Sequence, residues 1–236
     1  MKKIHFKSIN STNTYLKENY LKLPNFTCVS SAHQSQGHGR YNRSWESNEN
    51  ENLMFSMLIK DKTLINNFSS ISLVSAVCVY KLLTSYKINN ISIKWPNDVY
   101  VNDKKICGIL LEGIASEMIA VGIGININQK EFSKEIEHKT TSIYKELNKK
   151  TSIYFLKNKL YHLLYKELKK IKNNDNSYLS IIRENNYLKN KEVIAQVDNK
   201  EVLVKVININ EDNTLKIKVD GKIINLSSGE ITFHNN

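Results

Sequence analysis

The segment Gln34-Ser-Gln-Gly-His-Gly-Arg-Tyr-Asn-Arg-Ser-Trp45 differs in composition from the rest of this chain. The whole sequence holds 31 Lys and three Arg, and two of the arginines, Arg40 and Arg43, lie in this one segment. A guanidinium binds a carboxylate or phosphate through two parallel hydrogen bonds, which a lysine ammonium cannot do. The glycines let the backbone approach a ligand closely, and Trp45 offers a flat face for stacking. We expect a loop that binds a planar, anionic ligand such as a nucleotide; the alternative is a polar surface loop ending at a core tryptophan.

Apolar patterns on both sides of this loop predict strands and helices. Alternating or continuous apolar runs predict strands over 4–8, 26–31, 53–60, 88–94, 99–101, 105–112 and 117–127. Apolar residues at helical spacing predict helices over 11–20, 63–86, 151–172 and 177–186. Ser11 or Thr12 is the expected N-cap of the first helix.

Two further segments carry residues typical of binding sites. Lys94-Trp-Pro-Asn-Asp98 follows a strand that its proline must end or bend, because proline cannot donate to a sheet ladder. Gly122-Ile-Gly-Ile-Asn126 is strand-like, with glycines where a ligand or another backbone can approach. Binding sites collect at strand ends, so we expect both segments, with Lys105, to meet the arginine loop. The alternatives are strand termination, a solvated lysine and relief of crowding.

The pattern changes beyond Leu188 to short strands separated by turns. These strands are expected at 192–197, 201–208, 215–219, 222–226 and 230–233. Closely spaced short strands of this kind are typical of a small β-barrel domain. The length of 236 residues accommodates such a domain beside a larger one of about 190 residues.

Composition excludes several classes of protein. Apolar content of 41% and charged content of 24% are those of a soluble globular protein. No run of about 18 apolar residues occurs, and no apolar segment follows the basic N-terminus, so we expect a cytoplasmic protein without a membrane span. Cys28, Cys78 and Cys107 are widely spaced in apolar runs and are expected to be buried free thiols.

The net charge of +11 raises the possibility of a nucleic-acid-binding module without enzymatic activity. The lysines are spread along the whole chain, mixed with Asn and Ile, and do not gather around aromatic residues. A solvated lysine surface is the simpler interpretation, and we expect no nucleic-acid partner.

The three segments together resemble the motifs of the biotin–protein ligases. Gly37-His-Gly-Arg-Tyr-Asn-Arg-Ser-Trp45 is similar to that family's Gly-Arg-Gly-Arg-x-Gly-Arg-x-Trp loop. The other matching segments follow in family order: Ser11–Asn13, Lys94–Asp98, Lys104–Glu112, Gly122–Asn126 and Gly229–Ile231. The resemblance covers essentially the whole chain.

This resemblance implies an α+β fold in two parts. Residues 1–187 would form a catalytic domain with a mixed β-sheet flanked by helices, like that of class II aminoacyl-tRNA synthetases. Residues 188–236 would form a small SH3-like β-barrel. Only ten residues precede Ser11, so we expect none of the DNA-binding helix-turn-helix found in longer relatives.

The resemblance also implies a two-step reaction. Biotin and ATP would give biotinyl-5′-AMP and pyrophosphate, and a lysine of a biotin carboxyl carrier protein, such as that of acetyl-CoA carboxylase, would then take the biotin and release AMP. Mg²⁺ would accompany ATP, held by its phosphates and without protein metal ligands. The expected partners are the carrier and, as an open possibility, a second copy of the chain.

Individual residues acquire expected roles in the same way. The expected catalytic residues are Arg40 and Lys105, which would hold the carboxylate and the α-phosphate, and Asp98, which would orient or deprotonate the incoming lysine. Biotin would also be bound by Ser11, Thr12, Asn13, Gln34, Gly37, His38 and Gly39. ATP or the adenylate would be bound by Arg43, Trp45, Lys94, Asn97, Gly124 and Asn126.

Two positions depart from the family pattern. His38 stands where the pattern has Arg, and Asn42 stands where it has Gly. Asn tolerates positive φ, so Asn42 fits the loop, whereas His38 removes a permanent charge.

The nearest rival is a lipoate–protein ligase of the same fold, whose Arg-Arg-x-Ser-Gly-Gly-Gly loop is absent here. A dinucleotide-binding oxidoreductase would need a third glycine and a helix after Gly124.

Overall fold

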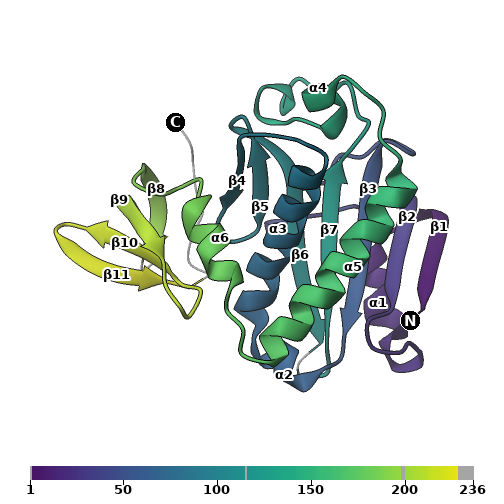
Figure 1. The fold of residues 1–236 in the computed structure, drawn as a ribbon, viewed down its shortest axis with the longest axis horizontal. Helices are drawn as coiled ribbons and strands as arrows, with labels where there is room; N and C mark the ends of the chain where they lie inside the picture. Colours follow the sequence, from purple (N-terminus) through teal and green to yellow (C-terminus); the bar gives the residue numbers. More distant parts are fainter. Residues whose placement is uncertain (1, 115, 198–199, 228–236) are drawn as a thin grey trace.

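The structure is a computed structural model that describes residues 2–114, 116–197 and 200–227 (Figure 1). Its larger sheet has seven strands in the order β1-β2-β3-β7-β6-β5-β4. β1 and β2 run parallel and the other neighbours run antiparallel, so the expected mixed sheet is confirmed. The strands are β1 (Lys3–Ile9), β2 (Cys28–Gln34), β3 (Asn52–Ile59), β4 (Ile91–Lys94), β5 (Asp98–Val101), β6 (Lys104–Ile114) and β7 (Met118–Asn126).

Helices flank this sheet on both faces, as expected. α3 (Phe68–Ser85) and α5 (Ile153–Lys172) lie against one face, and α1 (Thr12–Asn19) lies against the other (Figure 1). The other described helices are α2 (Lys62–Asn66), α4 (Ile143–Leu147) and α6 (Tyr178–Glu184). Short 3₁₀ turns occupy Tyr20–Lys22, Arg40–Asn42 and Glu137–Lys139.

α5 shows why its sequence forms a helix. Leu156, Leu160, Leu164 and Leu168 recur every four residues, and each is at most 1% exposed. Burying a leucine side chain contributes about 1.5–3 kcal/mol, so this stripe holds α5 against α3 and the sheet. The amphipathic pattern predicts exposed lysines, and Lys159, Lys166, Lys169 and Lys172 are exposed, whereas Lys157 is partly buried and donates to the Ser30 hydroxyl at 3.1 Å.

Side chains along β7 define the two faces of the sheet. The Ile and Val side chains at odd positions of 119–125 are buried in the core beneath α3 and α5. Met118 and Ala120 instead pack against α1. Because side chains alternate along a strand, Gly122 and Gly124 continue the row on the α1 face. Their missing side chains leave room above the sheet at this point.

The predicted single helix over 63–86 is wrong, because the chain forms two helices that meet at Asn67. Asn67 has a non-helical backbone (φ −102°, ψ 39°), and its side-chain amide donates to the carbonyl of Thr63 at 2.8 Å. A side chain that bonds nearby backbone in this way competes with the helical ladder. Asp61 caps the first of the two helices, accepting from the backbone N–H of Leu64 at 3.3 Å.

α4 was not predicted from the sequence. It is only five residues long, too short for apolar periodicity to identify. Ser142 caps it by accepting from the N–H of Lys145 at 3.2 Å, and Asn148 ends it in the left-handed conformation (φ 49°).

α3 is, among the described residues, the one helix long and apolar enough to cross a membrane by length and composition. Two thirds of it (67%) is buried inside the protein. Its apolar character therefore matches its position against the sheet and beside α5, where it forms much of the core.

The C-terminal part forms a second, antiparallel sheet with the order β11-β10-β9-β8. Its strands are β8 (Glu192–Val197), β9 (Lys200–Ile209), β10 (Leu215–Val219) and β11 (Lys222–Leu226). Four of the five predicted strands are thus confirmed. The fifth, at 230–233, and the family-like segment Gly229–Ile231 lie outside the described residues. Barrel closure and the domain boundary after residue 187 stay predictions.

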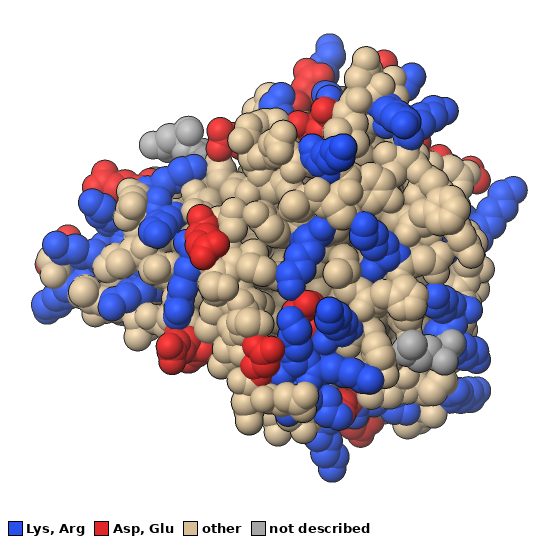
Figure 2. All heavy atoms as spheres, viewed as in Figure 1, with Lys and Arg blue, Asp and Glu red and all other residues tan. Residues whose placement is uncertain are grey.

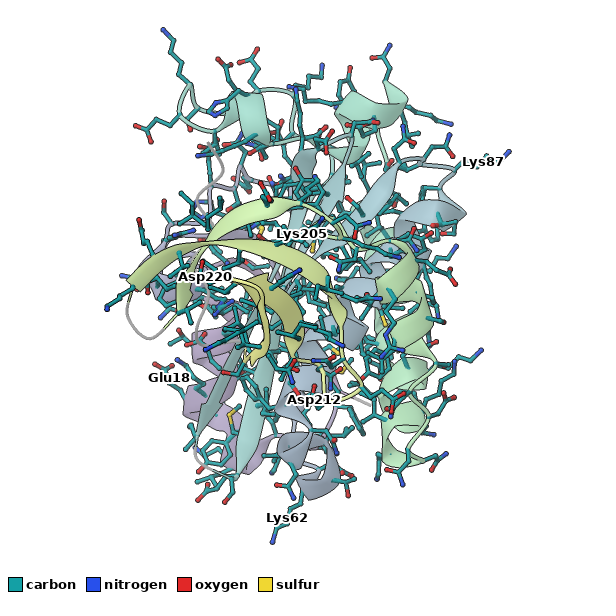
Figure 3. All side chains as sticks on the ribbon, turned by 90° about the vertical axis from the view of Figure 1, so that its left-hand side faces the viewer. Glu18, Lys62, Lys87, Lys205, Asp212 and Asp220 are labelled. Atoms are coloured by element: carbon teal, nitrogen blue, oxygen red, sulfur yellow. The ribbon has the colours of Figure 1, made fainter. Side chains whose placement is uncertain are left out.

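Asn213, in the turn between β9 and β10, joins the two sheets. Its carbonyl accepts the indole N–H of Trp95 at 2.9 Å, and its side-chain oxygen accepts the hydroxyl of Tyr178 at 2.7 Å. Asn213 Nδ2 also donates to the hydroxyl of Ser70 at 3.0 Å. Figure 3 views this small sheet in front of the larger domain, with Lys205 and Asp220 on its outer part.

Lysines are spread over the molecular surface. On the face shown in Figure 2, Lys and Arg side chains lie over both the helices and the C-terminal sheet, with acidic residues between them. This distribution agrees with the solvated lysine surface expected from the sequence.

Candidate active site

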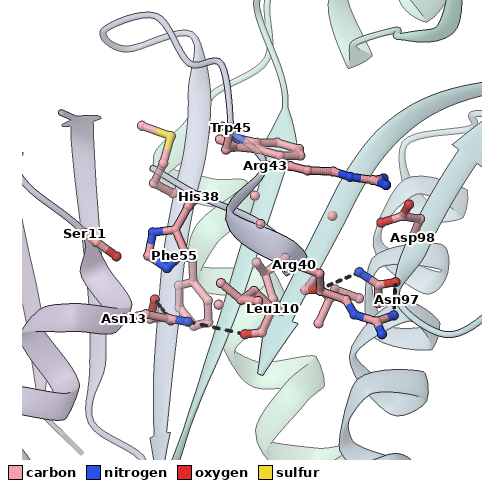
Figure 4. A pocket seen from close by; sticks show the side chains of 18 of the residues that line it. Ser11, Asn13, His38, Arg40, Arg43, Trp45, Phe55, Asn97, Asp98 and Leu110 are labelled. Atoms are coloured by element: carbon pink, nitrogen blue, oxygen red, sulfur yellow. Dashed lines mark hydrogen bonds between the residues drawn. The ribbon is translucent and has the colours of Figure 1, made fainter. Parts of the chain in front are cut away.

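A cavity of about 190 Å³ opens on the α1 face of the large sheet, beneath the loop 34–45 (Figure 4). Arg40 and Lys105, which are 65 positions apart in the sequence, both line it. The other expected site residues that line it are Ser11, Thr12, Asn13, Gln34, His38, Gly39, Arg43, Trp45, Lys94, Asn97, Asp98 and Gly124. Gly37 and Asn126 are not part of the lining.

The loop 34–45 folds back on itself as a small hairpin. Gly39 N–H donates to the Arg43 carbonyl at 2.8 Å, and Trp45 N–H donates to the Gly37 carbonyl at 3.0 Å. Tyr41, at the turn, has φ 56°, a left-handed conformation that costs a non-glycine residue free energy. Strain of this kind is typical of loops whose shape is needed for binding.

One end of the cavity carries a chain of neutral hydrogen bonds. Gln34 Oε1 accepts from both the N–H and the hydroxyl of Thr12, at 2.7 and 2.9 Å. The Thr12 hydroxyl lies 2.6 Å from that of Ser56, which donates to Asn13 Oδ1 at 2.6 Å. Thr12, Asn13 and Ser56 are buried, and Ser11 caps α1 as predicted. Such a network fixes donors and acceptors for a neutral polar group without adding charge.

Glu112 anchors this end of the cavity to charged groups. Its carboxylate accepts from Asn13 Nδ2 at 2.9 Å, pairs with the ammonium of Lys17 and lies 3.5 Å from His38 Nε2. Burial acts to raise the pKa of Glu112, but the hydrogen bonds from Lys17 and Asn13 outweigh it and hold the pKa below its ordinary value. His38 thus contacts a carboxylate at the position where the family pattern has a permanent cation.

The ring of Trp45 packs against two glycines. Gly108 and Gly124 are paired across β6 and β7. A Cβ added at Gly124 would lie 2.6 Å from Trp45 Cε2, and one at Gly108 would lie 3.0 Å from Cζ3. No larger residue fits at Gly124 without moving the ring. The indole N–H of Trp45 is buried and has no hydrogen-bond acceptor in the described part of the chain.

The opposite end of the cavity is charged. Arg40 Nη1 donates to Asn97 Oδ1 at 3.4 Å, and Asn97 is itself held by its amide on the Ile109 carbonyl at 2.9 Å. Lys105 Nζ pairs with Asp98 Oδ1 at 2.7 Å. Figure 4 shows Asn97 and Asp98 on the side of the cavity opposite Ser11, Asn13 and His38. The charged groups come from β5, β6 and the arginine loop, which the strand pairing brings together.

Lys94 ends β4 at this charged end, directly opposite Asp98 in the strand register. Burial lowers the pKa of the Lys94 ammonium, and Lys105, Lys191 and Arg43 lower it further, while Asp98 opposes them. A lysine in such a setting gives up its proton more readily than an exposed one.

Asn126 is not part of the cavity lining in this structure. Its side-chain oxygen accepts from Asn52 Nδ2 at 3.0 Å, and its amide donates to the Thr141 carbonyl at 3.0 Å. Both polar ends of Asn126 are therefore engaged inside the protein, and its contact with adenine stays a prediction. A Cβ added at Gly37 would lie 3.1 Å from Gln34 Nε2 and 3.3 Å from the Trp45 carbonyl oxygen.

Sequence reasoning missed several residues at the cavity. Ser56 and Leu110 line it, and Glu112 and Lys17 hold its neutral end. A signal was available for Ser56, because a lone serine interrupts the apolar run of β3 and such a serine must find a partner inside. No local pattern connects Lys17 with Glu112, since only the pairing of β6 against α1 brings them together.

Comparison with proteins of known structure identifies the class to which this fold belongs: the biotin protein ligases. A structure of the biotin protein ligase from Aquifex aeolicus, in complex with biotin and ATP, matches with a TM-score of 0.90 and 29% identity, covering 100% of this chain and 99% of that chain. In the sequence, residues 5–128 match the model of the Biotin/lipoate A/B protein ligase family. The chain belongs to that family.

Two curated relatives extend this comparison. The bifunctional ligase/repressor BirA of Bacillus spizizenii is 33% identical over 126 residues, which is 51% of this chain and 39% of that protein. BirA of Escherichia coli K12 is 26% identical over 234 residues, covering 95% of this chain and 71% of that protein. The chain thus spans about two fifths of the Bacillus relative it matches.

Proposed function

We propose that this protein is an ATP-dependent biotin–protein ligase that forms biotinyl-5′-AMP and transfers biotin to a lysine of a carrier domain. The observation that carries the proposal is a single cavity with two chemically different ends. The neutral network of Thr12, Ser56 and Asn13 suits an uncharged ureido ring. The charged end, with Arg40 and Lys105, suits a carboxylate and a phosphate. The likeness to a biotin- and ATP-bound structure supports the same assignment.

In the first step, a biotin carboxylate oxygen attacks the α-phosphorus of ATP, and the bond from that phosphorus to the bridging oxygen of pyrophosphate breaks. Negative charge builds up on the phosphoryl oxygens. Arg40 and Lys105 both line the cavity, and they are the cations that we assign to stabilise this charge. Trp45 covers the adenylate, and its unpaired indole N–H offers a further donor.

In the second step, the amine of a carrier lysine attacks the carbonyl carbon of the adenylate, and the bond to AMP breaks. The amine must lose a proton, and Asp98 is the carboxylate at the charged end. Without ligand, Asp98 is paired with Lys105 at 2.7 Å. A bound phosphate gives Lys105 a second anionic partner, so Asp98 becomes available to accept the proton. Lys94 and Asn97 line the same side.

Magnesium enters this scheme with ATP. Within residues 2–114, 116–197 and 200–227, no group of three His, Cys, Asp or Glu side chains is arranged to hold a metal ion. Mg²⁺ commonly binds through phosphates with one or two carboxylates and several waters. We assign it to the ATP phosphates, where it would neutralise charge on the leaving pyrophosphate.

The test is isotope exchange between pyrophosphate and ATP. The account expects exchange that requires biotin and is not supported by lipoate, followed by transfer of biotin to a carrier domain. Exchange with lipoate alone would make the protein a lipoate ligase of the same family. Absence of exchange with either acid would remove the proposed function.

A further inference from the structure

Lys94 lies over an aromatic ring on its own sheet. In the β4–β5 register Lys94 faces Asp98, and Ser92 faces Tyr100. Tyr100 is therefore diagonal to Lys94 on the same face, a position from which long side chains touch. The Lys94 Nζ atom lies 5.5 Å from the centre of the Tyr100 ring, within the range of a cation–π contact.

A second ring extends this contact. Tyr187 stacks on Tyr100, with ring centres 4.7 Å apart and planes inclined by 22°. On the far side, Lys191 Nζ lies 3.5 Å from the centre of the Tyr187 ring. Lys94, Tyr100, Tyr187 and Lys191 form one stack, which we call the tyrosine ladder. It begins at the cavity and ends at the residue before β8.

The backbone fixes Tyr187 at this place. Ile93 N–H donates to the Asn185 carbonyl at 2.8 Å, and Tyr187 N–H donates to the Ile93 carbonyl at 3.0 Å. The segment 185–187 thus pairs in parallel with the outer edge of β4. Asn186 opposes Ile93, so Tyr187 falls beside Lys94. The same segment leads into the C-terminal sheet (Figure 1).

We propose that Tyr100 and Tyr187 are positioning residues that hold the Lys94 ammonium at the cavity, and that Tyr187 makes this placement depend on the segment joining the two sheets. A lysine side chain has four rotatable bonds, and holding it in one place costs conformational entropy. The ring face offsets that cost by attracting the ammonium. The use of Lys94 in biotin transfer rests on the proposed function, whereas the positioning itself does not.

Other charged groups also face Lys94. They are Asp98, Lys105, Lys191 and Arg43. Asp98 favours the ammonium and the three cations disfavour it. Burial disfavours the ammonium as well. A ring face adds to the groups that favour the ammonium, so we expect removal of a ring to raise the fraction of free amine.

The test measures the rate at which an amine-reactive ester labels Lys94, followed by mass spectrometry of its peptide between pH 7 and 10. Tyr100→Leu and Tyr187→Leu remove a ring face, so more Lys94 is free amine and labelling is about two- to fivefold faster at a given pH. Tyr100→Phe keeps the face and labels like the wild type. Tyr154→Leu, at an exposed tyrosine on α5, is the control.

A double variant tests whether the two rings act as one unit. If they do, Tyr100→Leu combined with Tyr187→Leu changes labelling no more than either single change. In biotin transfer at saturating ATP, we expect the single variants to lower kcat about two- to fivefold. A fall in kcat that Tyr100→Phe does not restore contradicts the role of the ring.

The proposal is overturned if Lys94 is labelled at an unchanged or slower rate in both leucine variants. It is also overturned if the effects of Tyr100→Leu and Tyr187→Leu on the labelling rate are fully additive in the double variant. Thermal unfolding identifies a variant that does not fold. If Tyr100→Leu is such a variant, Tyr187→Leu carries the same test from the other side of the stack. The two proposals can fail separately. If the wild type shows no biotin-dependent exchange but the variants label as expected, the proposed function is wrong and the positioning role of the tyrosine ladder is supported.

Discussion

At the scale of single residues, the proposed chemistry depends on which cations are rigid and which are paired. Arg40 lies against Asn97 and over Tyr41, 5.2 Å from that ring, so its guanidinium is held before any ligand binds. Lys105 is paired with Asp98 and is 5.8 Å from the centre of the Trp45 ring. Both cations are therefore positioned at the charged end of the cavity before a ligand binds.

Arg40→Ala should slow biotin-dependent pyrophosphate exchange about thirtyfold, because about 2 kcal/mol of charge-assisted hydrogen bonding to the transition state is lost. Arg40→Lys keeps the charge but loses the planar fork, and should recover only part of that rate. Exchange kinetics measured at saturating biotin check this. Wild-type kinetics in Arg40→Ala would exclude Arg40 from the reaction.

Glu112 gives a prediction on pH. Its folded-state pKa lies below the ordinary value of 4.5, so the stability it contributes is present above pH 4.5 and lost as the pH falls through the lowered pKa. Glu112→Gln should lower the free energy of unfolding by about 1 kcal/mol at pH 7, a modest value because Lys17 is partly exposed to solvent. The difference should shrink below pH 4.5.

Urea unfolding of both proteins at pH 7 and at stepwise lower pH values measures this difference. Glu49→Gln, in an exposed loop, is the matched control and should unfold like the wild type at pH 7. A destabilisation by Glu112→Gln that persists undiminished in acid would show that the carboxylate charge is not its source.

At the scale of elements, the paired glycines of β6 and β7 decide where the arginine loop rests. Gly124→Ala would place a Cβ 2.6 Å from Trp45 Cε2, so the ring must move. Overpacking of this kind costs about 1–3 kcal/mol. We expect a higher KM for ATP, since Trp45 is the proposed cover of the adenylate.

Trp45→Phe provides the rescue for that experiment. The smaller ring leaves room for the added methyl group, so the double variant should bind ATP better than the sum of the single effects implies. If the effects of Gly124→Ala and Trp45→Phe on the KM for ATP are strictly additive, the two residues do not interact in ATP binding, and this prediction is contradicted.

Most elements could be predicted from the sequence because their patterns are local. The stripe of α5 and the strands β8 to β11 follow from periodicity and turn residues alone. The break at Asn67 could not be predicted, because apolar spacing continues across it, and the structure shows there a non-helical backbone and an amide bond to Thr63. α4 is too short to show a period.

The candidate site was predictable where a motif carries it and unpredictable where strand pairing does. The arginine loop, Lys105 and Asp98 were recognisable as motifs, and the structure brings them to one cavity. The position of the Trp45 ring depends on the pairing of Gly108 with Gly124 across β6 and β7. No local sequence pattern predicts this pairing. The expected contact of Asn126 with adenine stays a prediction, and in this structure its side chain bonds Asn52 and Thr141.

At the scale of the whole molecule, the two sheets are joined by Asn213 and by the segment 185–187. Asn213 is 7% exposed and has φ 70°, a conformation that Asn tolerates better than most residues. It accepts from Trp95, directly beside Lys94, and from Tyr178 on α6. The position of the C-terminal sheet is thus coupled to the charged end of the cavity.

Asn213→Ala should lower the free energy of unfolding by about 1–3 kcal/mol, because the Tyr178 hydroxyl loses its acceptor and the backbone φ is unfavourable for Ala. Asn213→Gly loses the same side-chain bonds but relieves the backbone, and should be the milder change. Calorimetry should show Tm falling by about 2–4 °C for each kcal/mol. Equal Tm values for the wild type, Asn213→Ala and Asn213→Gly would show that the Asn213 side chain does not stabilise the fold.

The central claim is that Arg40 and Lys105 converge on the point where an acid is joined to AMP. A crystal structure of the protein with biotin and ATP tests it most directly. The account predicts biotinyl-5′-AMP in the cavity, its phosphate within about 3 Å of both Arg40 and Lys105 and its purine against Trp45. A phosphate bound elsewhere, with the Arg40 guanidinium contacting no ligand atom, would contradict it.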